Sequence, residues 1–467
     1  MNKIKFGTDG WRAIIGDDYT VENVARVSVA VAKFLHERYE NPSVVIGHDC
    51  RFAGKLFADT AAKVFALNNI KVMLAHSFVT TPMVSLAVVQ RNASLGVVIT
   101  ASHNPPSYNG YKLKGEFGGP LLPNDVEIVE NLISDKCDLD FKSVKIEDFI
   151  FKKHIEVVDL ETTYFQHARA CFDLDLINNS KLNFAYDAMY GAGRNIISSL
   201  LPNAVLLHCD NNPGFNEVAP EPIHRNLKEF SQLIKNSDID CGLATDGDAD
   251  RIGLYDSEGN FVDAHHIILL LIHYLVKYKN WNGKIVTAFS CSVKVAQICE
   301  HYNLDHEIVK IGFKHIAGKM ITEDVLLGGE ESGGIATKGH IPERDGLWMG
   351  LTLFEFMAKS GKKLNDLINE VYEIVGSFAF ERIDLHLENV QKRKIIDNCK
   401  NNYYQSFGKY KVQRVETIDG FKFFFDDNKW LMIRPSGTEP VLRTYSEAET
   451  QEIALDILKS TQDTILK

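Results

Sequence analysis

Paired cysteines are the first feature that this chain lacks. Its eight cysteines among 467 residues are scattered singly, with no C-x-x-C and no Cys/His pairing at the spacing of a zinc site. A chain of this length can bury large hydrophobic cores and needs no disulfide framework to fold. We therefore expect neither structural zinc nor structural disulfides, and the length suggests about three or four domains.

Long hydrophobic runs are also missing. The longest aliphatic stretch, IILLLI at Ile267 to Ile272, is too short to span a bilayer, and the opening MNKIKFGTDGWR has no apolar segment typical of a secretory signal. We expect a soluble, cytoplasmic protein with no membrane partner. The net charge of −11 and the lack of a basic block argue against a nucleic-acid partner, since binding to a phosphate backbone needs clustered lysine and arginine.

What the chain does contain is a repeated layout. In three successive segments, α/β material leads to an apolar strand that ends in a polar loop: SLGVVI before TASHNP, IDCGLA before TDGDADR, and VLLGG before EESGG. Strands that alternate with helices favour α/β layers, whose ligands bind beyond the carboxyl ends of the strands. The C-terminal part is different, with several strands followed by a helix, which is typical of an α+β module. We expect four domains, over residues 1–150, 151–258, 259–375 and 376–467.

The first polar loop, TASHNPPSYNGYK, contains Ser102, His103 and Lys112. Ser102 is a candidate nucleophile, but a serine hydroxyl needs a base or an electrophilic partner to react. Because adjacent side chains diverge, we expect His103 to serve in loop hydrogen bonding or ligand contact rather than as the base. Lys112 could return to the loop and exchange a proton with a substrate hydroxyl, although a solvated surface lysine is the simpler interpretation.

The second loop, TDGDADR, carries Asp246, Asp248 and Asp250 at alternate positions. In extended backbone this spacing turns the three carboxylates to one side, where they repel one another unless a cation binds between them. A set of oxygen ligands suits Mg²⁺. A solvated acidic turn is the alternative. An EF-hand is excluded because Arg251 stands where its loop requires glycine.

Two further loops contain groups suited to a phosphorylated, hydroxyl-rich ligand. IRPSGTEPVLR places Arg434 and Arg443 around a Ser-Gly-Thr turn, so that guanidinium groups, hydroxyls and a glycine backbone could bind phosphate oxygens. GGEESGG sets Glu330 and Ser332 in a flexible glycine frame that could hydrogen-bond to sugar hydroxyls. Each loop by itself is also consistent with an ordinary turn.

Together and in this order, these motifs resemble the α-D-phosphohexomutase family, which includes phosphoglucomutases and phosphomannomutases. The resemblance covers nearly the whole chain, from FGTDGWR through TASHNPPSYNGYK, TDGDADR and GEESGG to RPSGTEPVLR. It implies an α/β fold with three similar α/β domains of mixed sheets and a C-terminal α+β domain around a central cleft. It also implies an isomerase that interconverts hexose 1-phosphate and hexose 6-phosphate through a phosphoserine and a sugar 1,6-bisphosphate.

The resemblance assigns roles residue by residue. Ser102 would carry the phosphoryl group, with Lys112 and Arg12 in catalytic roles. Mg²⁺ would be held by an oxygen of phosphorylated Ser102 and by the three aspartates of the second loop, Asp246, Asp248 and Asp250. Substrate binding would fall to a larger set: Arg251, Lys314, Glu330, Ser332, Arg434, Ser436, Gly437, Thr438 and Arg443. Glucose 1,6-bisphosphate would be activator and intermediate, sugar phosphates would be the partners, and the sequence leaves the oligomeric state open.

One position departs from the phosphomannomutase pattern GEMSGH, in which histidine follows the last glycine. Here that position is Gly334. The downstream KGHIPERDG resembles phosphoglucomutases, so His340 could supply the missing imidazole in catalysis, and Lys338 or Arg344 a phosphate contact. This favours glucose as the sugar, with phosphomannomutase or phosphoglucosamine mutase specificity as the alternative. Two further hypotheses stay open: a metal-dependent sugar phosphatase that uses the same serine, and a sugar-phosphate binding protein with an inactive centre.

Overall fold

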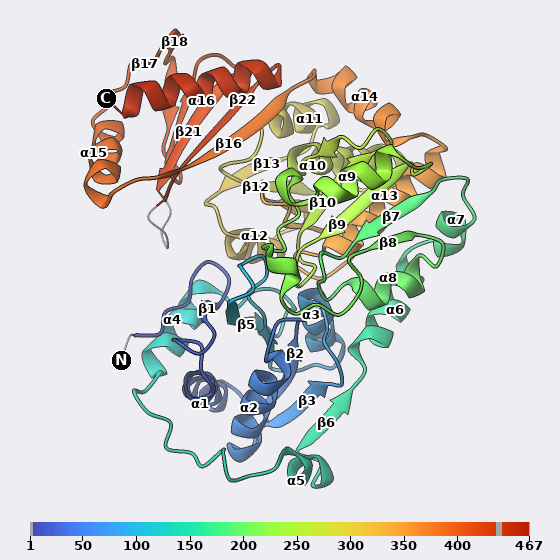
Figure 1. The fold of residues 1–467 in the computed structure, drawn as a ribbon, viewed down its shortest axis with the longest axis vertical. Coiled ribbons are helices and arrows are strands. Elements are labelled where there is room, and N and C mark those ends of the chain that lie inside the picture. The colour runs from blue at the N-terminus through green and yellow to red at the C-terminus, as the bar shows by residue number, and fades with distance from the viewer. Residues whose placement is uncertain (1–2, 436–440, 467) are drawn as a thin grey trace.

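The computed structural model describes residues 3–435 and 441–466. Four units follow one another along the chain, and Figure 1 shows the fourth, drawn in red, beside the third at one end of the molecule. The predicted class, three α/β units with mixed sheets and a C-terminal α+β unit, is confirmed.

The first unit is a six-stranded mixed sheet in the order β1-β5-β4-β2-β3-β6. Its strands are β1 (Trp11–Ile14), β2 (Ser43–His48), β3 (Lys71–Ala75), β4 (Leu95–Ile99), β5 (Tyr108–Gly115) and β6 (Ile155–Val158). Its helices are α1 (Val21–Arg38), α2 (Gly54–Leu67), α3 (Thr81–Gln90), α4 (Pro123–Leu132) and α5 (Ile146–Phe151). Strands β4, β2, β3 and β6 run parallel, and β5 returns antiparallel beside β4. Because β6 follows residue 150, this sheet extends beyond the first expected domain boundary.

The second unit is a five-stranded sheet in the order β11-β10-β9-β7-β8. Its strands are β7 (Phe184–Asp187), β8 (Val205–Leu207), β9 (Cys241–Thr245), β10 (Ile252–Asp256) and β11 (Phe261–Val262). Its helices are α6 (Leu160–Cys171), α7 (Leu174–Asn178), α8 (Arg194–Leu200) and α9 (Lys228–Lys235), with short turns η1 (Phe215–Glu217) and η2 (His224–Asn226). Strands β7, β8 and β9 are parallel, and β10 is antiparallel to β9.

The third unit is a four-stranded sheet in the order β13-β12-β14-β15. Its strands are β12 (Lys284–Ala288), β13 (His306–Val309), β14 (Val325–Gly329) and β15 (Ile335–Thr337). Its helices are α10 (Ala264–His273), α11 (Lys294–Tyr302), α12 (Phe313–Met320), α13 (Gly346–Ser360) and α14 (Leu364–Val375), with a π-helical turn η3 (Tyr274–Tyr278) after α10. Again the parallel strands are followed by one antiparallel strand, β15.

The fourth unit differs, because its main sheet is antiparallel throughout, in the order β16-β22-β21-β20-β19. Its strands are β16 (Ala379–His386), β19 (Arg414–Glu416), β20 (Phe421–Phe424), β21 (Trp430–Pro435) and β22 (Val441–Ala448). A separate hairpin consists of β17 (Ser406–Phe407) and β18 (Tyr410–Lys411), and the helices are α15 (Asn389–Lys400) and α16 (Gln451–Ile465).

The three α/β units share one structural feature that positions the site. In each, a buried parallel strand ends in a polar loop, and the chain then returns as an antiparallel strand: β4 to β5, β9 to β10, and β14 to β15. The apolar strands are buried on both faces, so the polar residues collect where each strand ends. The sequence predicted the apolar strand and the polar loop at SLGVVI, IDCGLA and VLLGG, and the structure adds the antiparallel return strand.

Hydrophobic packing separates the fourth unit from the other three. One continuous core cluster includes buried residues from the first, second and third units, such as Val84, Leu243 and Leu353. The fourth unit has its own core beneath α16 and meets the third through a small cluster around Phe289 and Trp430. Among the described helices, none has the length and apolar composition that crossing a bilayer requires.

Candidate active site

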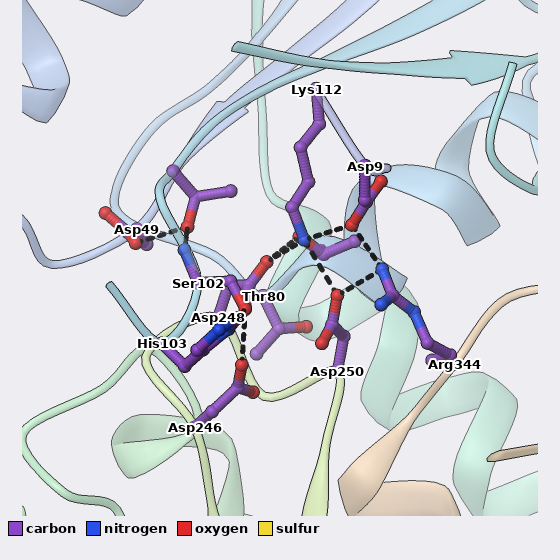
Figure 2. Close-up of polar contacts among 12 residues, drawn as sticks. Asp9, Asp49, Thr80, Ser102, His103, Lys112, Asp246, Asp248, Asp250 and Arg344 are labelled. Carbon is purple, nitrogen blue, oxygen red and sulfur yellow. Dashed lines mark hydrogen bonds and ion pairs between the residues drawn. The ribbon is translucent and has the colours of Figure 1, made fainter. Parts of the chain in front are cut away.

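The serine loop leaves the carboxyl end of β4 and places Ser102 at the centre of the candidate site (Figure 2). Ser102 is fully buried, and its backbone φ of 53° lies in the left-handed region. Its hydroxyl donates a hydrogen bond to Oδ2 of Asp246 at 2.7 Å. Nδ1 of His103 lies 3.2 Å from the same Oγ, so the expectation that the two neighbouring side chains diverge is wrong. Burial lowers the pKa of His103, and the charges of nearby arginines lower it further, so the imidazole is neutral.

The second polar loop joins β9 to β10 and brings together Asp246, Asp248 and Asp250, all of them fully buried. One oxygen from each carboxylate lies within 4.8 Å of the others. Oδ1 of Asp248 and Oδ1 of Asp250 have no hydrogen-bond partner among the described residues, a costly arrangement for buried oxygens. Burial raises the pKa of Asp246 well above its usual value, and the charges of the other two aspartates raise it further. A divalent cation such as Mg²⁺ fits this donor set, because it would bind the unpaired carboxylate oxygens and offset the repulsion among the three aspartates.

Lys112, on β5, reaches the same cluster from the first unit. Its Nζ lies 2.7 Å from Oδ2 of Asp248, 2.7 Å from Oδ2 of Asp250 and 2.8 Å from Oδ2 of Asp9. Burial by itself would lower the pKa of Lys112, but the charges of the three carboxylates outweigh it and raise the pKa. Lys112 is therefore an ammonium group enclosed by carboxylates, not the solvated surface lysine of the simpler interpretation.

A second set of ion pairs joins the third unit to the first and to the second. Nη2 of Arg344 lies 2.7 Å from Oδ2 of Asp250 and also pairs with Asp9. Nζ of Lys114 lies 2.6 Å from Oε2 of Glu343 and 3.5 Å from Oδ1 of Asp9. All but Asp9 are nearly or fully buried, so breaking one of these pairs would leave an uncompensated charge inside the protein.

The first unit also holds the aspartate loop directly. Thr81, the first residue of α3, donates its backbone N–H to the carbonyl oxygen of Asp248 at 3.0 Å. Its hydroxyl donates to Oδ2 of Asp248 at 2.5 Å. Burial would raise the pKa of Asp248, but the charge and hydrogen bond of Lys112 and the hydrogen bond from the Thr81 hydroxyl lower it, so the carboxylate is ionised. Two domains therefore fix the position of one carboxylate.

The third polar loop, between β14 and β15, contains Glu330 and Ser332. Glu330 is buried, its Oε1 accepts the backbone N–H of Gly312 at 2.8 Å, and burial raises its pKa to about 7. Ser332 is half-buried. A β-carbon at Gly334 would lie 2.4 Å from Cδ of Arg344, because the arginine side chain crosses directly over that glycine. Gly334 therefore makes room for the arginine that bonds to Asp250.

The structure places His340 in a closed packing layer. Its ring stacks on Trp348 with centroids 3.8 Å apart and an interplanar angle of 5°. Its Nε2 lies 3.0 Å from Oδ2 of Asp345, and its Nδ1 lies 3.1 Å from Nε2 of His167. The side chain is fully buried. Because both ring nitrogens are engaged, this histidine has no ring nitrogen left to donate to or accept from a substrate, and the catalytic role expected for it has no support in the geometry.

Of the other predicted cationic residues, Arg12 and Arg251 contact the loops of the centre. Nη1 of Arg12 donates to Oδ1 of Asn104, in the serine loop, at 2.7 Å. The backbone N–H of Arg251 donates to Oδ1 of Asp246 at 3.1 Å. Lys314 lines a pocket of about 270 Å³ beside the loop that precedes β1. Arg12 and Arg251 are thus tied to the two loops that carry the serine and the aspartates.

The fourth unit contributes an arginine pair. Arg434 and Arg443 are direct neighbours on the adjacent strands β21 and β22. Nε and Nη2 of Arg434 donate to the two carboxylate oxygens of Asp419 at 3.3 and 3.2 Å. Three other predicted phosphate-binding residues lie outside the described residues: Ser436, Gly437 and Thr438.

Sequence reasoning missed several polar residues that support this centre. They are Asp9, Asp49, Arg51, Thr81 and Thr100. A signal was present for two of them, because β2 also ends in a polar segment, HDCR, at the same edge of the sheet as the serine loop. Thr81 carried no such signal, since its partner Asp248 is 167 positions away.

Comparisons with known proteins cover the whole architecture. Family models for phosphoglucomutase/phosphomannomutase match residues 3–138 (alpha/beta/alpha domain I), 162–259 (domain II), 263–375 (domain III) and 389–463 (C-terminal domain). A phosphoglucomutase/phosphomannomutase of Thermococcus kodakarensis is 30% identical over 98% of this chain and 97% of its own. A phosphoglucosamine mutase of Methanocaldococcus jannaschii is 31% identical over 97% of this chain and 96% of its own. The crystal structure of a candidate phosphomannomutase from Thermus thermophilus is 29% identical and covers 100% of both chains, with a TM-score of 0.88.

Proposed function

Because the chain belongs to the phosphoglucomutase/phosphomannomutase family of mutases, we propose that it interconverts hexose 1-phosphates and hexose 6-phosphates through phosphorylated Ser102. The observation that carries this proposal is the 2.7 Å hydrogen bond from Ser102 to Asp246, inside a carboxylate cluster that also encloses Lys112. A serine held among groups that can bind both a cation and a phosphoryl group is suited to accept and release phosphate.

The reaction has two balanced half-steps. In the first, the bond between phosphorus and Oγ of Ser102 breaks as the free hydroxyl oxygen of the sugar phosphate bonds to phosphorus. That hydroxyl loses a proton, and the serine oxygen regains one. The product is a sugar 1,6-bisphosphate. In the second half-step, after the sugar has exchanged its two ends, Oγ of Ser102 loses its proton and bonds to the phosphorus of the other phosphate. The bond between that phosphorus and the sugar oxygen breaks, the sugar oxygen gains a proton, and the isomer is released.

Lys112 is the group placed to donate a proton. Its three carboxylate partners hold it as an ammonium group, so it can protonate the oxygen that leaves phosphorus. Its positive charge also offsets the charge on the phosphoryl oxygens. Arg12, tied to the serine loop through Asn104, adds a second positive charge on the same side.

Asp246, Asp248 and Asp250 would hold Mg²⁺ beside the phosphoryl group. When bound, the ion would neutralise negative charge on the transferring phosphoryl oxygens. The chain's own contribution is to bury three carboxylates close together and to leave Oδ1 of Asp248 and Oδ1 of Asp250 unpaired within the part that the structure describes.

A second phosphate site is needed because the sugar binds in two opposite orientations. We assign it to the arginine pair Arg434 and Arg443 and to the neighbouring Ser436, Gly437 and Thr438. A planar guanidinium binds phosphate oxygens through paired hydrogen bonds, and Arg434 has one carboxylate partner, Asp419, to exchange for a phosphate. Glu330 and Ser332 would bind sugar hydroxyls. Arg251 and Lys314 would contact the sugar phosphate at the edge of the site.

The sugar that the protein prefers is the finer part of the proposal. The sequence favoured glucose because KGHIPERDG resembles phosphoglucomutases, and the closed packing of His340 gives no support to the part of that argument in which its imidazole acts on the sugar. The Methanocaldococcus jannaschii phosphoglucosamine mutase is as similar as the Thermococcus relative, so the alternative, glucosamine or mannose phosphate, has the better support. Glucose 1,6-bisphosphate or the matching amino-sugar bisphosphate would be the activator.

The test is a side-by-side rate comparison on the 1-phosphates of glucose, mannose, glucosamine and N-acetylglucosamine. Each assay contains Mg²⁺ and a trace of the matching 1,6-bisphosphate, and both sugar 6-phosphate and free phosphate are measured. We expect 6-phosphate to accumulate with at least one sugar, fastest with glucosamine. Release of free phosphate in its place would support the sugar phosphatase and contradict the mutase.

A further inference from the structure

Both Nη atoms of the Arg51 guanidinium are bound by the backbone of the serine loop. Its Nη1 donates to the carbonyl oxygens of Pro105 and Tyr108, at 2.9 and 3.1 Å. Its Nη2 donates to the carbonyl oxygens of Ser102 and Asn104, each at 2.6 Å. These bonds use all four Nη hydrogens of a residue that is only 3% exposed. Arg51 therefore has no Nη donor left for a phosphate, although it carries positive charge close to Ser102.

Asp49 completes the arrangement from the other side of Ser102. Its Oδ2 lies 3.3 Å from Nε of Arg51 and accepts the hydroxyl of Thr100 at 2.5 Å. Oγ1 of Thr100 in turn accepts the backbone N–H of Ser102 at 2.9 Å. The backbone of Ser102 is thus held at its N–H through Thr100 and Asp49, and at its carbonyl oxygen by Arg51.

Ser102 needs this support because of its backbone conformation. A φ of 53° is sparsely populated for a residue with a β-carbon, and such conformations persist only where the surroundings enforce them. In this conformation the serine hydroxyl bonds to Asp246 in the second unit. Arg51 also lies against the ring of Phe215, 5.0 Å from its centroid, so the guanidinium packs at the same boundary between units.

We propose that Asp49 and Arg51 act as a positioning pair that fixes the phosphoryl-carrying loop, holding Ser102 in its left-handed conformation with Oγ toward Asp246. Neither side chain contacts the reacting oxygen, so both are positioning residues. A lysine could satisfy only part of this role, because its ammonium lacks the planar fork that reaches four carbonyl oxygens at once. The expected kinetic effect rests on the proposed function, whereas the hydrogen bonds that hold the loop do not depend on it.

The test compares Arg51→Lys and Arg51→Met with a matched control, Arg26→Met. Arg26 is also 3% exposed in the first unit and donates to a backbone carbonyl, that of Ser134, at 2.6 Å, which is outside the serine loop. For each folded variant, kcat, KM, the fraction of Ser102 phosphorylated by sugar 1,6-bisphosphate, and Tm are measured. We expect kcat to fall about 100-fold in both Arg51 variants with KM changed less than about threefold, since misplacing a reacting group by about 1 Å costs this much.

Arg26→Met is expected to lower Tm while kcat per folded molecule stays unchanged. If Arg51→Lys keeps the wild-type kcat, or loses only what Arg26→Met loses, the positioning role is overturned. A rise in KM with kcat unchanged would instead make Arg51 a substrate ligand and would also overturn it.

Asp49→Asn, which keeps an oxygen to accept the Thr100 hydroxyl, is expected to lose less activity than Arg51→Met.

Hydrogen exchange separates failure of this inference from failure of the proposed function, because it requires no turnover. Amides of residues 102–108 should exchange at least about tenfold faster in Arg51→Lys than in wild type, with α1 unchanged as the internal reference. Unchanged exchange in the loop contradicts the positioning pair even if the enzyme is active. Faster exchange in a protein that acts on no sugar phosphate would support the pair and reject the mutase.

Discussion

The serine loop of the first unit and the arginine pair of the fourth unit are both assigned to phosphate, yet they are built in opposite ways. Ser102 is fully buried, its N–H, carbonyl and hydroxyl are all hydrogen-bonded, and it faces a neighbouring unit across a shared core. Arg434 has a side chain that is 19% exposed and pairs with Asp419 within its own unit. The fourth unit also has a separate core.

This difference matches two different tasks. A group that forms and breaks a bond must be held within a fraction of an ångström, which a buried, fully bonded loop achieves. A group that grips whichever phosphate is not reacting must bind and release it in two sugar orientations, which suits an accessible guanidinium with an exchangeable partner. Substitutions in the two regions should therefore separate kcat from KM.

The largest effect is expected at the aspartate cluster. Asp248→Asn removes a negative charge from the Mg²⁺ site and from Lys112, so kcat should fall at least about 100-fold and the Mg²⁺ titration should shift to higher concentration. Steady-state rates across a Mg²⁺ series measure both. Asp187→Asn, at a buried aspartate elsewhere in the second unit, is the control and should leave the titration in place. A normal titration in Asp248→Asn would remove this loop from the metal site.

Arg434→Ala should act on substrate binding. The side chain would contact the idle phosphate in ground and transition states alike, so its loss should raise KM by roughly tenfold to a hundredfold while kcat stays within a few-fold. Initial rates over a range of sugar 1-phosphate concentrations give both constants. A fall in kcat with KM unchanged would contradict the contrast between the two regions.

Glu330 gives a smaller, pH-dependent effect on stability. Burial raises its pKa to about 7, so between the ordinary glutamate pKa and about 7 the folded protein binds a proton that the unfolded chain releases. The unfolding free energy should therefore fall as pH rises through this window, by at most about 1.4 kcal/mol per pH unit. Urea unfolding of wild type and Glu330→Gln at pH 5 and pH 7.5 isolates the contribution of Glu330. The unfolding free energy of the variant should fall less between the two pH values than that of wild type. Identical losses would show that Glu330 is already ionised at pH 5.

The smallest effect on catalysis is expected at His340. His340→Gln should lower Tm, because it removes the stack on Trp348, yet kcat per folded molecule should stay within about threefold. Activity is normalised to the folded fraction measured by circular dichroism. A large loss of kcat in fully folded protein would return His340 to the catalytic role that the sequence suggested.

The sequence predicted the strands and polar loops that recur in the three α/β units, and it missed several side chains that hold these loops in place. Strands followed by polar loops were evident three times, because burial on both faces makes each strand continuously apolar and concentrates polar residues at its end. Ser102 and the aspartates could be placed together only through the family resemblance, since they lie 144 or more positions apart. The role of Thr81 followed from no local pattern. The packing of His340 could not be foreseen, because proximity to Gly334 in sequence does not reveal a ring stacked on Trp348.

The most direct measurement is the transfer of a labelled phosphoryl group through Ser102. The protein is incubated with radiolabelled sugar 1,6-bisphosphate and Mg²⁺, the phosphopeptide is identified by mass spectrometry, and unlabelled hexose 1-phosphate is then added. The account predicts label on Ser102 that is passed to sugar bisphosphate within one turnover, and none in Ser102→Ala. Turnover of hexose phosphate with no label on Ser102, or by the alanine variant, would contradict it.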